Sequence, residues 1–214
     1  MPPRPLVPSA VFVSGGGTNL QAVIDAVRAE ALALDLRLVV SNTADAYALQ
    51  RARDAGIPTA VIEWDRARES RTAYAMRLVE AVRNSGATLV LLLGWMHVLA
   101  KEFLEAGFEG VLNLHPSYLP DDPTADSVTL PDGRVTRVYR GAHALRDAIE
   151  AREAMTGATL IEITPLVDRG SVLARRTFAL RPDDDEATAL ARLREVEHDV
   201  VTTGITKWLQ RKGR

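Results

Sequence analysis

An asparagine and a histidine stand two positions apart near the middle of the chain, in the sequence Asn113-Leu114-His115-Pro116-Ser117. In an extended strand, residues two apart point to the same side, so Asn113 and His115 would project together. Pro116 is expected to end the strand just after them. An amide donor beside an imidazole can stabilise an oxyanion, and the motif predicts such a site. The alternative is a strand end whose two polar side chains are satisfied locally.

A glycine-rich stretch between the first predicted strand and its helix reads SGGGTN and runs from Ser14 to Asn19. Glycines let a backbone approach a ligand closely, and the amides of Gly17, Thr18 and Asn19 would lie at a helix N-terminus, which favours an anion. The stretch lacks a Walker A lysine and a dinucleotide fingerprint, so it indicates a phosphate monoester rather than a triphosphate. The alternative is an ordinary tight turn with Thr18 or Asn19 capping the helix.

Two further stretches carry aromatic or acidic side chains. Trp95 and Met96 follow an apolar run and could line a slot for a flat ring, unless both belong to the core. The neighbouring His97 is expected as a partly exposed residue at a helix start. Asp168 stands in a short late loop, where its carboxylate would either orient His115 and accept a proton or stay solvated.

Basic and acidic residues on two predicted helices have two interpretations. Arg71 follows Ser70, a candidate N-cap, and Arg194 comes one turn before Glu197. Ordinary surface charge explains all of them. Basic side chains could also meet a phosphate.

Apolar runs alternate with amphipathic stretches, which predicts an α/β fold with a mostly parallel open sheet flanked by helices on both faces. Strands are expected over residues 10–13, 36–40, 59–62, 89–93, 111–115, 158–163 and 172–180. Helices are expected over residues 19–31, 46–55, 70–85, 101–106, 141–152 and 185–209. Residues 120–138 break the pattern; they are loop-like, and a turn signal at 131–133 could join a small hairpin.

Composition narrows the function classes. The chain has 214 residues, a length that suits one large domain. Its net charge of −2 does not indicate binding to nucleic acid or to an anionic membrane. The absence of cysteine excludes disulfides and thiol catalysis. The four histidines lack paired ligand spacing, which argues against zinc, and Ser117 lacks a Gly-x-Ser-x-Gly elbow. With no signal-peptide core and no membrane-length apolar segment, a cytoplasmic protein is expected.

Several stretches, taken in order, resemble one family. From about Ala10 to Trp208, the chain is similar to the glycinamide ribonucleotide formyltransferases, folate-dependent enzymes of purine synthesis. The stretch from Asn113 to Ser117 is shared by the wider formyltransferase fold, and SGGGTN is the more specific part. The motifs that carry the resemblance are Ser14–Gln21, Val40–Ala46, Arg51–Ile57, Leu93–Met96, Leu112–Ser117, Val167–Gly170 and Glu197–His198.

The resemblance implies a Rossmann-like formyltransferase fold and a reaction without a metal. The formyl group of the co-substrate 10-formyltetrahydrofolate would pass to the amine of glycinamide ribonucleotide through a tetrahedral intermediate. The implied catalytic residues are Asn113, His115 and Asp168. The residues implied to bind the ribonucleotide phosphate and ribose are Gly17, Thr18, Asn19, Arg71, Arg194 and Glu197. The residues implied to bind folate are Met96, His97, Val98, Leu99, Ile163, Pro165 and Val167.

The resemblance also predicts a single domain over residues 1–214, with an N-terminal extension at 1–8. An insertion at 121–138 stands where the family has a short connection. Small-molecule substrates are expected as partners, without nucleic acid or membrane, and a homodimer is one assembly that the family similarity allows. The rival functions are formyltetrahydrofolate hydrolase, a formyltransferase with another amine acceptor, and a phosphate-ligand binding module without catalysis.

Overall fold

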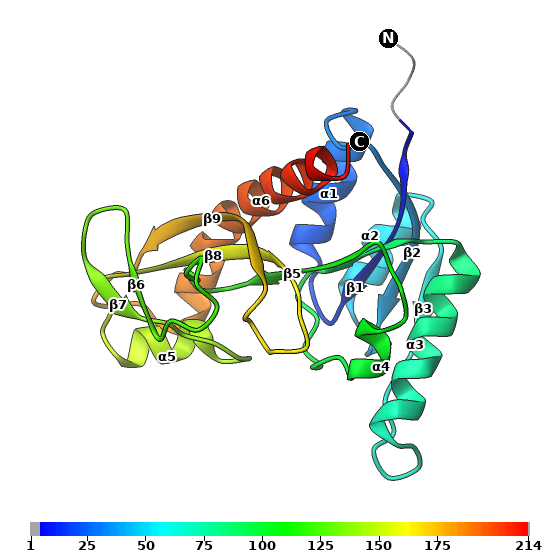
Figure 1. Ribbon diagram of the computed structural model, residues 1–214, viewed down its shortest axis with the longest axis horizontal. Helices are drawn as coiled ribbons and strands as arrows, with labels where there is room; N and C mark the ends of the chain where they lie inside the picture. The colour runs from blue at the N-terminus through cyan, green and yellow to red at the C-terminus, as the bar shows by residue number, and fades with distance from the viewer. Residues whose placement is uncertain (1–4, 214) are drawn as a thin grey trace. The chain divides into compact units, whose positions relative to one another are not determined.

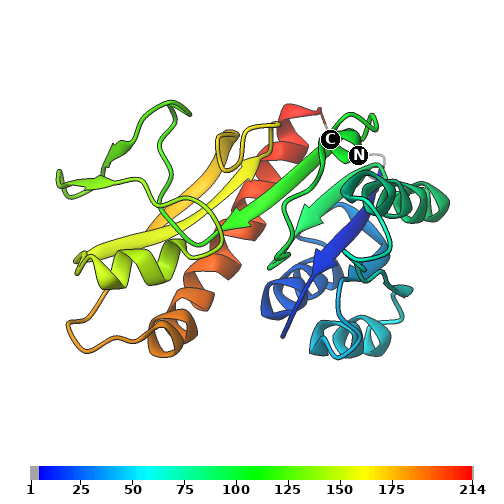
Figure 2. The same cartoon turned by 90° about the horizontal axis from the view of Figure 1, so that it is seen from below.

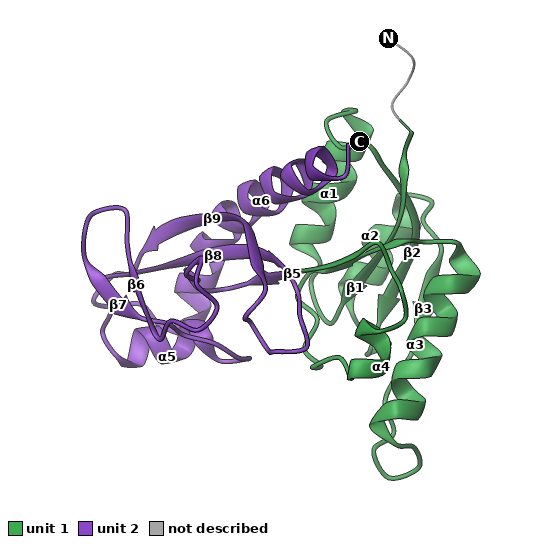
Figure 3. Cartoon of the chain, viewed as in Figure 1, with its two compact units in different colours: residues 1–112, 214 green, residues 113–213 purple. Residues whose placement is uncertain are grey.

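The computed structural model describes residues 5–213, which divide into two compact units (Figure 3). Unit 1 comprises the described residues up to Leu112, and unit 2 runs from Asn113 to Gly213. The chain passes from one unit to the next within strand β5 (Gly110–His115). Asn113 is therefore the first residue of unit 2.

Unit 1 contains a parallel sheet with the strand order β3-β2-β1-β4. Helices α1 and α2 lie on one side of these strands, and α3 lies on the other (Figures 1 and 2). Its strands are β1 (Val7–Val13), β2 (Leu34–Ser41), β3 (Thr59–Val61) and β4 (Leu89–Leu92). Its helices are α1 (Thr18–Arg28), α2 (Tyr47–Asp54), α3 (Arg71–Ser85) and α4 (Lys101–Leu104).

Local sequence signals explain where the elements of unit 1 begin and end. Ser70 caps α3 because its hydroxyl accepts a hydrogen bond from the Ala73 amide at 3.1 Å. Gly86 ends α3 in the left-handed conformation, with φ of 71°. Every residue of β4 is buried, as the apolar run predicted. Phe12 of β1 packs against Phe103 with ring centroids 5.5 Å apart, which places α4 on the core.

Unit 2 contains the strand order β5-β8-β9, and β8 (Met155–Glu162) pairs antiparallel with β9 (Ser171–Ala179). Helix α6 (Glu186–Arg211) packs on both of these strands. A Cβ atom on Gly204 of α6 would come within 2.5 Å of the Leu160 side chain, so the helix approaches β8 closely there. The short helix α5 (Ala144–Glu150) precedes β8.

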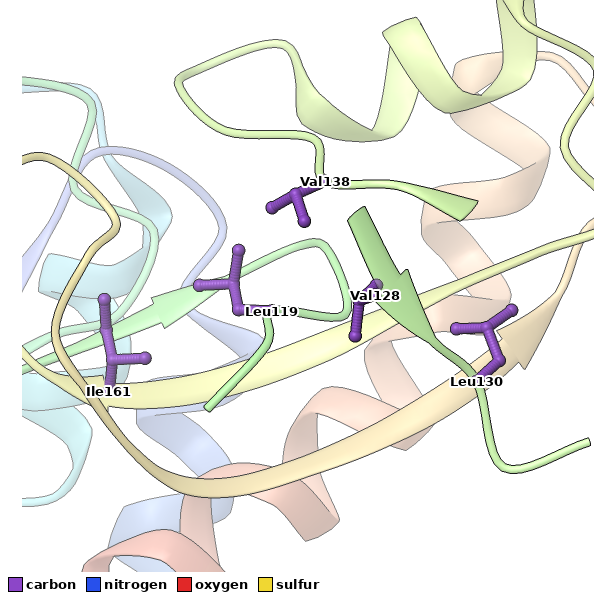
Figure 4. Close-up of a cluster of buried hydrophobic side chains, with 5 residues drawn as sticks. All are labelled: Leu119, Val128, Leu130, Val138 and Ile161. Atoms are coloured by element: carbon purple, nitrogen blue, oxygen red, sulfur yellow. The ribbon is translucent and has the colours of Figure 1, made fainter. Parts of the chain in front are cut away.

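Residues 121–138 contain a two-stranded hairpin, formed by β6 (Ser127–Thr129) and β7 (Val135–Arg137). Its apolar side chains contribute to a cluster on unit 2 that is shown in Figure 4. Ile161 of β8 belongs to this cluster, whereas its neighbour Leu160 faces Gly204 of α6. Successive strand residues point to opposite faces, so the hairpin and α6 cover opposite faces of β8. The buried members of the cluster are Leu119, Val128, Leu130, Val138 and Ile161.

The sequence-based prediction of a mostly parallel α/β fold is confirmed. Most element boundaries differ from the predicted ones by one to three residues, and β1 and α5 are two examples. Strand β1 begins at Val7, so residues 7 and 8 of the predicted N-terminal extension are strand, and its residues 1–4 lie outside the described chain. Helix α5 is shorter than predicted because Gly141 and Arg152 have positive φ, 85° and 53°, which a right-handed helix excludes. That residues 1–214 act as a single domain stays a prediction.

Candidate active site

A histidine and an aspartate that are far apart in sequence meet inside unit 2. The Nδ1 atom of His115 lies 3.5 Å from an Oδ1 oxygen of Asp168. Both side chains are nearly inaccessible, at 4% and 8% exposure. His115 is the last residue of β5, where Pro116 ends the strand as predicted. Asn113 lies two residues earlier on the same strand and is half-buried, so it belongs to the same face as His115.

The segment Tyr139–Gly141 contacts both members of this pair through its main chain. The Tyr139 carbonyl lies 2.9 Å from Nε2 of His115, and the Gly141 amide donates to the other Asp168 oxygen at 2.7 Å. Since a carbonyl oxygen only accepts, Nε2 carries a proton. The carboxylate at Nδ1 is a second acceptor, so this environment accommodates a ring that donates from both nitrogens.

Asp168 adopts a conformation that is uncommon for a residue with a side chain, with φ of 52°. Aspartate tolerates this left-handed region better than most residues. The next glycine, Gly170, allows a close backbone approach, because a Cβ there would lie 2.1 Å from the Glu162 carbonyl. The loop is therefore shaped to turn the Asp168 carboxylate toward His115.

The chain that leaves β5 is held by one buried hydroxyl. Thr159 of β8 donates to the Ser117 carbonyl at 2.7 Å and accepts from the Leu119 amide at 3.0 Å. Thr159 is fully buried and Ser117 is 2% exposed. A buried, fully used hydroxyl resists movement, because breaking either bond would leave a polar group without a partner. This contact supports the strand end that carries His115.

In unit 1, the SGGGTN stretch forms the turn between β1 and α1. Gly17 is the N-cap residue of α1, with φ of 69° and no side-chain cap, so Thr18 and Asn19 do not cap the helix. A Cβ on Gly17 would lie 2.5 Å from the Ala48 side chain. The Gly15 and Gly16 carbonyls accept from the Ala48 amide at 3.0 Å and from Arg51 Nε at 2.8 Å, which ties the turn to α2. The N-terminus of a helix suits an anion, because the helix dipole places partial positive charge there.

The prediction that His97 begins a helix is wrong. His97 lies in the irregular segment before α4, because Ala100 is the N-cap of that helix. Its ring packs edge-on against Trp64, Tyr74 and Trp95, with centroids 5.7 to 5.9 Å away. Burial, followed by the charges of Arg66 and Arg71, lowers the pKa of His97.

The neighbours of His97 divide between core and surface. Trp95 is 8% exposed and packs on Phe12, so it belongs to the core. Met96 and Val98 are 58% and 52% exposed, and Leu99 is half-buried. The Met96 amide donates to the Ser14 hydroxyl at 3.0 Å, so the segment after β4 touches the glycine turn within unit 1.

The remaining candidate residues lie on three elements. Arg71 is exposed at the start of α3, with its guanidinium 5.7 Å from the centre of the Trp64 ring. On α6, Arg194 is exposed and Glu197 is buried at 7% exposure, so Glu197 is not ordinary surface charge. In the loop before Asp168, Ile163 is half-buried, whereas Pro165 and Val167 are exposed.

No side-chain pattern in the sequence marks Tyr139 and Gly141 as partners of the histidine–aspartate pair. Their contacts use a carbonyl and an amide, which every residue except proline carries. A glycine after an irregular stretch was the one visible hint, and it is consistent with many turns.

Residues 5–213 lack the features of two other kinds of site. Within this range, no group of three or more histidine, aspartate or glutamate side chains is arranged to hold a metal ion. None of the helices described there combines the length and apolar character that a membrane crossing requires.

These features define a class: an α/β protein with a parallel sheet and a buried imidazole–carboxylate pair at the carboxyl end of a strand. Within that class, the chain belongs to the formyl transferase family, whose sequence profile matches residues 8–205. The family that the sequence motifs resemble is thereby confirmed.

Individual relatives agree with this assignment. The phosphoribosylglycinamide formyltransferase of Escherichia coli K12 is 33% identical over 190 residues, which cover 89% of this chain and 81% of the relative. The trifunctional purine biosynthetic protein adenosine-3 of Drosophila melanogaster is 35% identical over 191 residues, and the matched part is 13% of its length. The crystal structure of glycinamide ribonucleotide transformylase 1 from Symbiobacterium toebii superposes with a TM-score of 0.82 at 31% identity, covering 98% of this chain and 89% of that one.

Proposed function

We propose that this protein transfers the formyl group of 10-formyltetrahydrofolate to the primary amine of glycinamide ribonucleotide, a step of purine synthesis. The observation that carries the proposal is the buried contact between Asp168 and His115, the last residue of the strand that also presents Asn113. Relatives of similar length named phosphoribosylglycinamide formyltransferase support the choice of substrates.

In the proposed reaction, the neutral amine attacks the formyl carbon and a new carbon–nitrogen bond forms. The carbonyl oxygen becomes an oxyanion, which the Asn113 amide and a protonated His115 stabilise by hydrogen bonds. The intermediate collapses when the bond from the formyl carbon to the folate nitrogen breaks. The amine loses a proton and the folate nitrogen gains one, with Asp168 relaying it directly or through a water.

His115 has to exchange or share an acceptor before it can donate to that oxyanion. The bond from Nε2 to the Tyr139 carbonyl is a normal 2.9 Å, whereas the contact from Nδ1 to Asp168 is longer, at 3.5 Å. A charge-assisted hydrogen bond is usually about 2.7–2.9 Å long. The formyl oxygen would therefore share the Nδ1 proton most readily, with the carboxylate still beside the ring.

The remaining residues have proposed binding roles. The amides of Gly17, Thr18 and Asn19 bind the phosphate, supported by the left-handed Gly17 at the start of α1. Arg71 and Arg194 add positive charge for the phosphate, and Glu197 accepts from the ribose hydroxyls. The segment proposed to bind the folate comprises Met96, His97, Val98, Leu99, Ile163, Pro165 and Val167.

An absorbance assay of folate product tests the proposal, with and without glycinamide ribonucleotide. Product that forms only when the ribonucleotide is present is the expected result. Turnover without any amine would indicate formyltetrahydrofolate hydrolase, and turnover with a different amine would identify another acceptor. Absence of turnover with every formyl donor would leave the phosphate-binding module as the function. The close pairing of His115 with Asp168 speaks for catalysis over that module.

A cytoplasmic location and a homodimer complete the proposal. Sedimentation of the purified protein at several concentrations tests the dimer, and a constant monomer mass would reject it.

A further inference from the structure

The inserted segment, residues 121–138, is attached to unit 2 by apolar packing on one side. Val128, Leu130 and Val138 are buried in the cluster of Figure 4, together with Ile161 of β8. Ile163, the first residue of the loop that leads to Asp168, packs against the same cluster. Burial of several branched side chains contributes about 1.5–3 kcal/mol each, so the segment is a stable part of unit 2.

Two arginines connect the inserted segment to the residues that surround the histidine–aspartate pair. Arg140 donates to the Ala125 carbonyl at 2.7 Å and lies 3.3 Å from a carboxylate oxygen of Asp126. Arg169 donates to the Pro123 carbonyl and lies 3.6 Å from the same Asp126 oxygen. Both arginines therefore bind the 123–126 stretch at the start of the insertion.

Both arginines are sequence neighbours of residues that form or contact the histidine–aspartate pair. Arg140 stands between Tyr139, whose carbonyl contacts His115, and Gly141, whose amide contacts Asp168. Arg169 directly follows Asp168. Each guanidinium is thus adjacent, along the backbone, to an atom or residue that holds the pair.

The hydrogen bond from Arg140 to the Ala125 carbonyl is expected to contribute more than the ion pairs with Asp126. The Asp126 side chain is 86% exposed, and ion pairs in water contribute little, with a median of roughly 0–1 kcal/mol. The Arg140 side chain is only 16% exposed, so its bond to the Ala125 carbonyl is screened far less. Burial, followed by the nearby charge of Arg169, lowers the pKa of Arg140. Arg140 and Arg169 repel each other, and the carbonyl and carboxylate oxygens of residues 123–126 offset this repulsion.

We propose that the inserted segment is a positioning element for catalysis, and that Arg140 and Arg169 are the positioning residues through which it holds the His115–Asp168 pair. The inference rests on the proposed function for its kinetic consequence. The segment would orient Asp168 beside the imidazole whatever the substrate is.

The test replaces Arg140 with methionine, which keeps an unbranched side chain of similar length and removes every donor. In Arg140→Met, we expect kcat to fall about 10- to 100-fold, because small displacements of catalytic groups have effects of this size. KM for the ribonucleotide is expected to change less than about threefold, since Arg140 acts on turnover through the pair. Arg140→Lys, which can satisfy one acceptor, should recover part of the loss.

A double-mutant cycle with Asp168→Asn shows whether Arg140→Met lowers kcat through Asp168 or through an unrelated disturbance of the structure. If Arg140 acts through Asp168, adding Arg140→Met to Asp168→Asn should cost less than about threefold more in kcat. A loss that multiplies in full would overturn the inference. The matched control is Arg134→Met in the same inserted segment, where the guanidinium pairs with Asp132 at 2.6 Å within the hairpin turn. Its kcat should equal that of the wild type.

A second measurement needs no substrate. The ¹⁵N chemical shifts of the His115 ring, assigned by their loss in His115→Ala, report the contacts of both ring nitrogens. Arg140→Met and Asp168→Asn should move the Nδ1 shift in the same direction, and Arg134→Met should leave it unchanged. An Nδ1 shift and a kcat both unchanged in Arg140→Met would overturn the inference while the proposed function stands.

The two proposals can fail separately. If the wild type transfers no formyl group, the proposed function is wrong, and the ring spectra still decide whether the segment orients the pair. If Arg140→Met does not fold, Arg169→Met applies the same test at a more exposed side chain, 31% accessible. A wild-type spectrum and wild-type turnover in Arg169→Met would then reject the positioning role.

Discussion

At the scale of single residues, His115 is distinguished by having an acceptor at each ring nitrogen while it is almost fully buried. A buried polar ring with both nitrogens engaged is held in one orientation, because turning it would break contacts that water cannot replace. The orientation is therefore present before any substrate arrives. Preorganised donors of this kind are the usual source of oxyanion stabilisation.

Replacing His115 with alanine tests its proposed role. We expect His115→Ala to lower kcat by about 10²–10³-fold, the usual effect of losing one oxyanion donor. Binding of glycinamide ribonucleotide, measured by calorimetry, should change little because the phosphate is bound elsewhere in the proposal. Equal loss of turnover and binding would contradict an oxyanion role.

At the scale of elements, the turn between β1 and α1 depends on Gly17, which combines a positive φ with close contact to Ala48. Gly17→Ala should lower the free energy of unfolding by about 1–3 kcal/mol from backbone strain, with added cost from the clash. Urea titration measures that loss. Gly16→Ala is the matched control, since a Cβ at Gly16 meets nothing within 4 Å. Similar losses in both variants would show that the conformation of Gly17 is unimportant.

The start of α6 provides a pH-dependent test. Asp184 is paired with Arg192 through two contacts of 2.6 and 2.7 Å, and its side chain is 3% exposed. The hydrogen bond from Arg192 lowers the pKa of Asp184. A carboxyl whose pKa falls on folding stabilises the protein above its unfolded pKa, about 3.9, and loses that contribution as pH falls toward the folded value.

Asp184→Asn should therefore lower the Tm at pH 7, by about 2–4 °C for each kcal/mol lost. The Tm difference from the wild type should narrow as the pH is lowered below about 4, because the Asp184 carboxyl of the unfolded chain takes up a proton there while the folded carboxylate, paired with Arg192, stays ionised. Calorimetric scans at a series of pH values measure both effects. Asp183→Asn, at the exposed neighbouring position, is the control and should match the wild type. A difference that stays constant down to low pH would rule out the carboxylate as its cause.

At the scale of the whole molecule, strand β5 contributes residues to both compact units. Neither unit can then unfold with the whole strand intact, so we predict one cooperative transition, as a single domain requires. Trp64 and Trp95 report on unit 1, and Trp208 reports on unit 2. Fluorescence of Trp208→Phe, fluorescence of the Trp64→Phe/Trp95→Phe variant and far-UV circular dichroism should give coincident urea midpoints. Two separated midpoints would mean two independently folding units.

The sequence predicts the molecule best where structure is local. The alternation of apolar runs predicted the parallel strands, Pro116 predicted the end of β5, and Ser70 and Gly86 predicted the ends of α3. Each of these signals acts within a few residues of itself. The environment of His97 could not be predicted, because Trp64 and Tyr74 approach it only through the fold.

For the candidate site, the approach of Asp168 to His115 was expected, whereas the groups that support this pair were not. Family resemblance brought His115 together with Asp168, although spacing alone left Asp168 a solvated loop residue. The inserted segment looked like an irregular interruption, and its connection to the site runs through Arg140 and Arg169. Those contacts depend on tertiary geometry, for which a single sequence contains no periodic signal.

The segment Tyr139–Gly141 touches the histidine–aspartate pair with a carbonyl and an amide, and this has a consequence for genetics. A side-chain substitution does not remove a main-chain group, so Tyr139→Ala would keep the carbonyl that bonds to His115. Chemical synthesis reaches what codons cannot: an ester in place of the amide at Gly141 deletes one N–H and no side chain. The atoms that contact the pair most directly are main-chain atoms, so a point mutation affects them only by changing the backbone conformation.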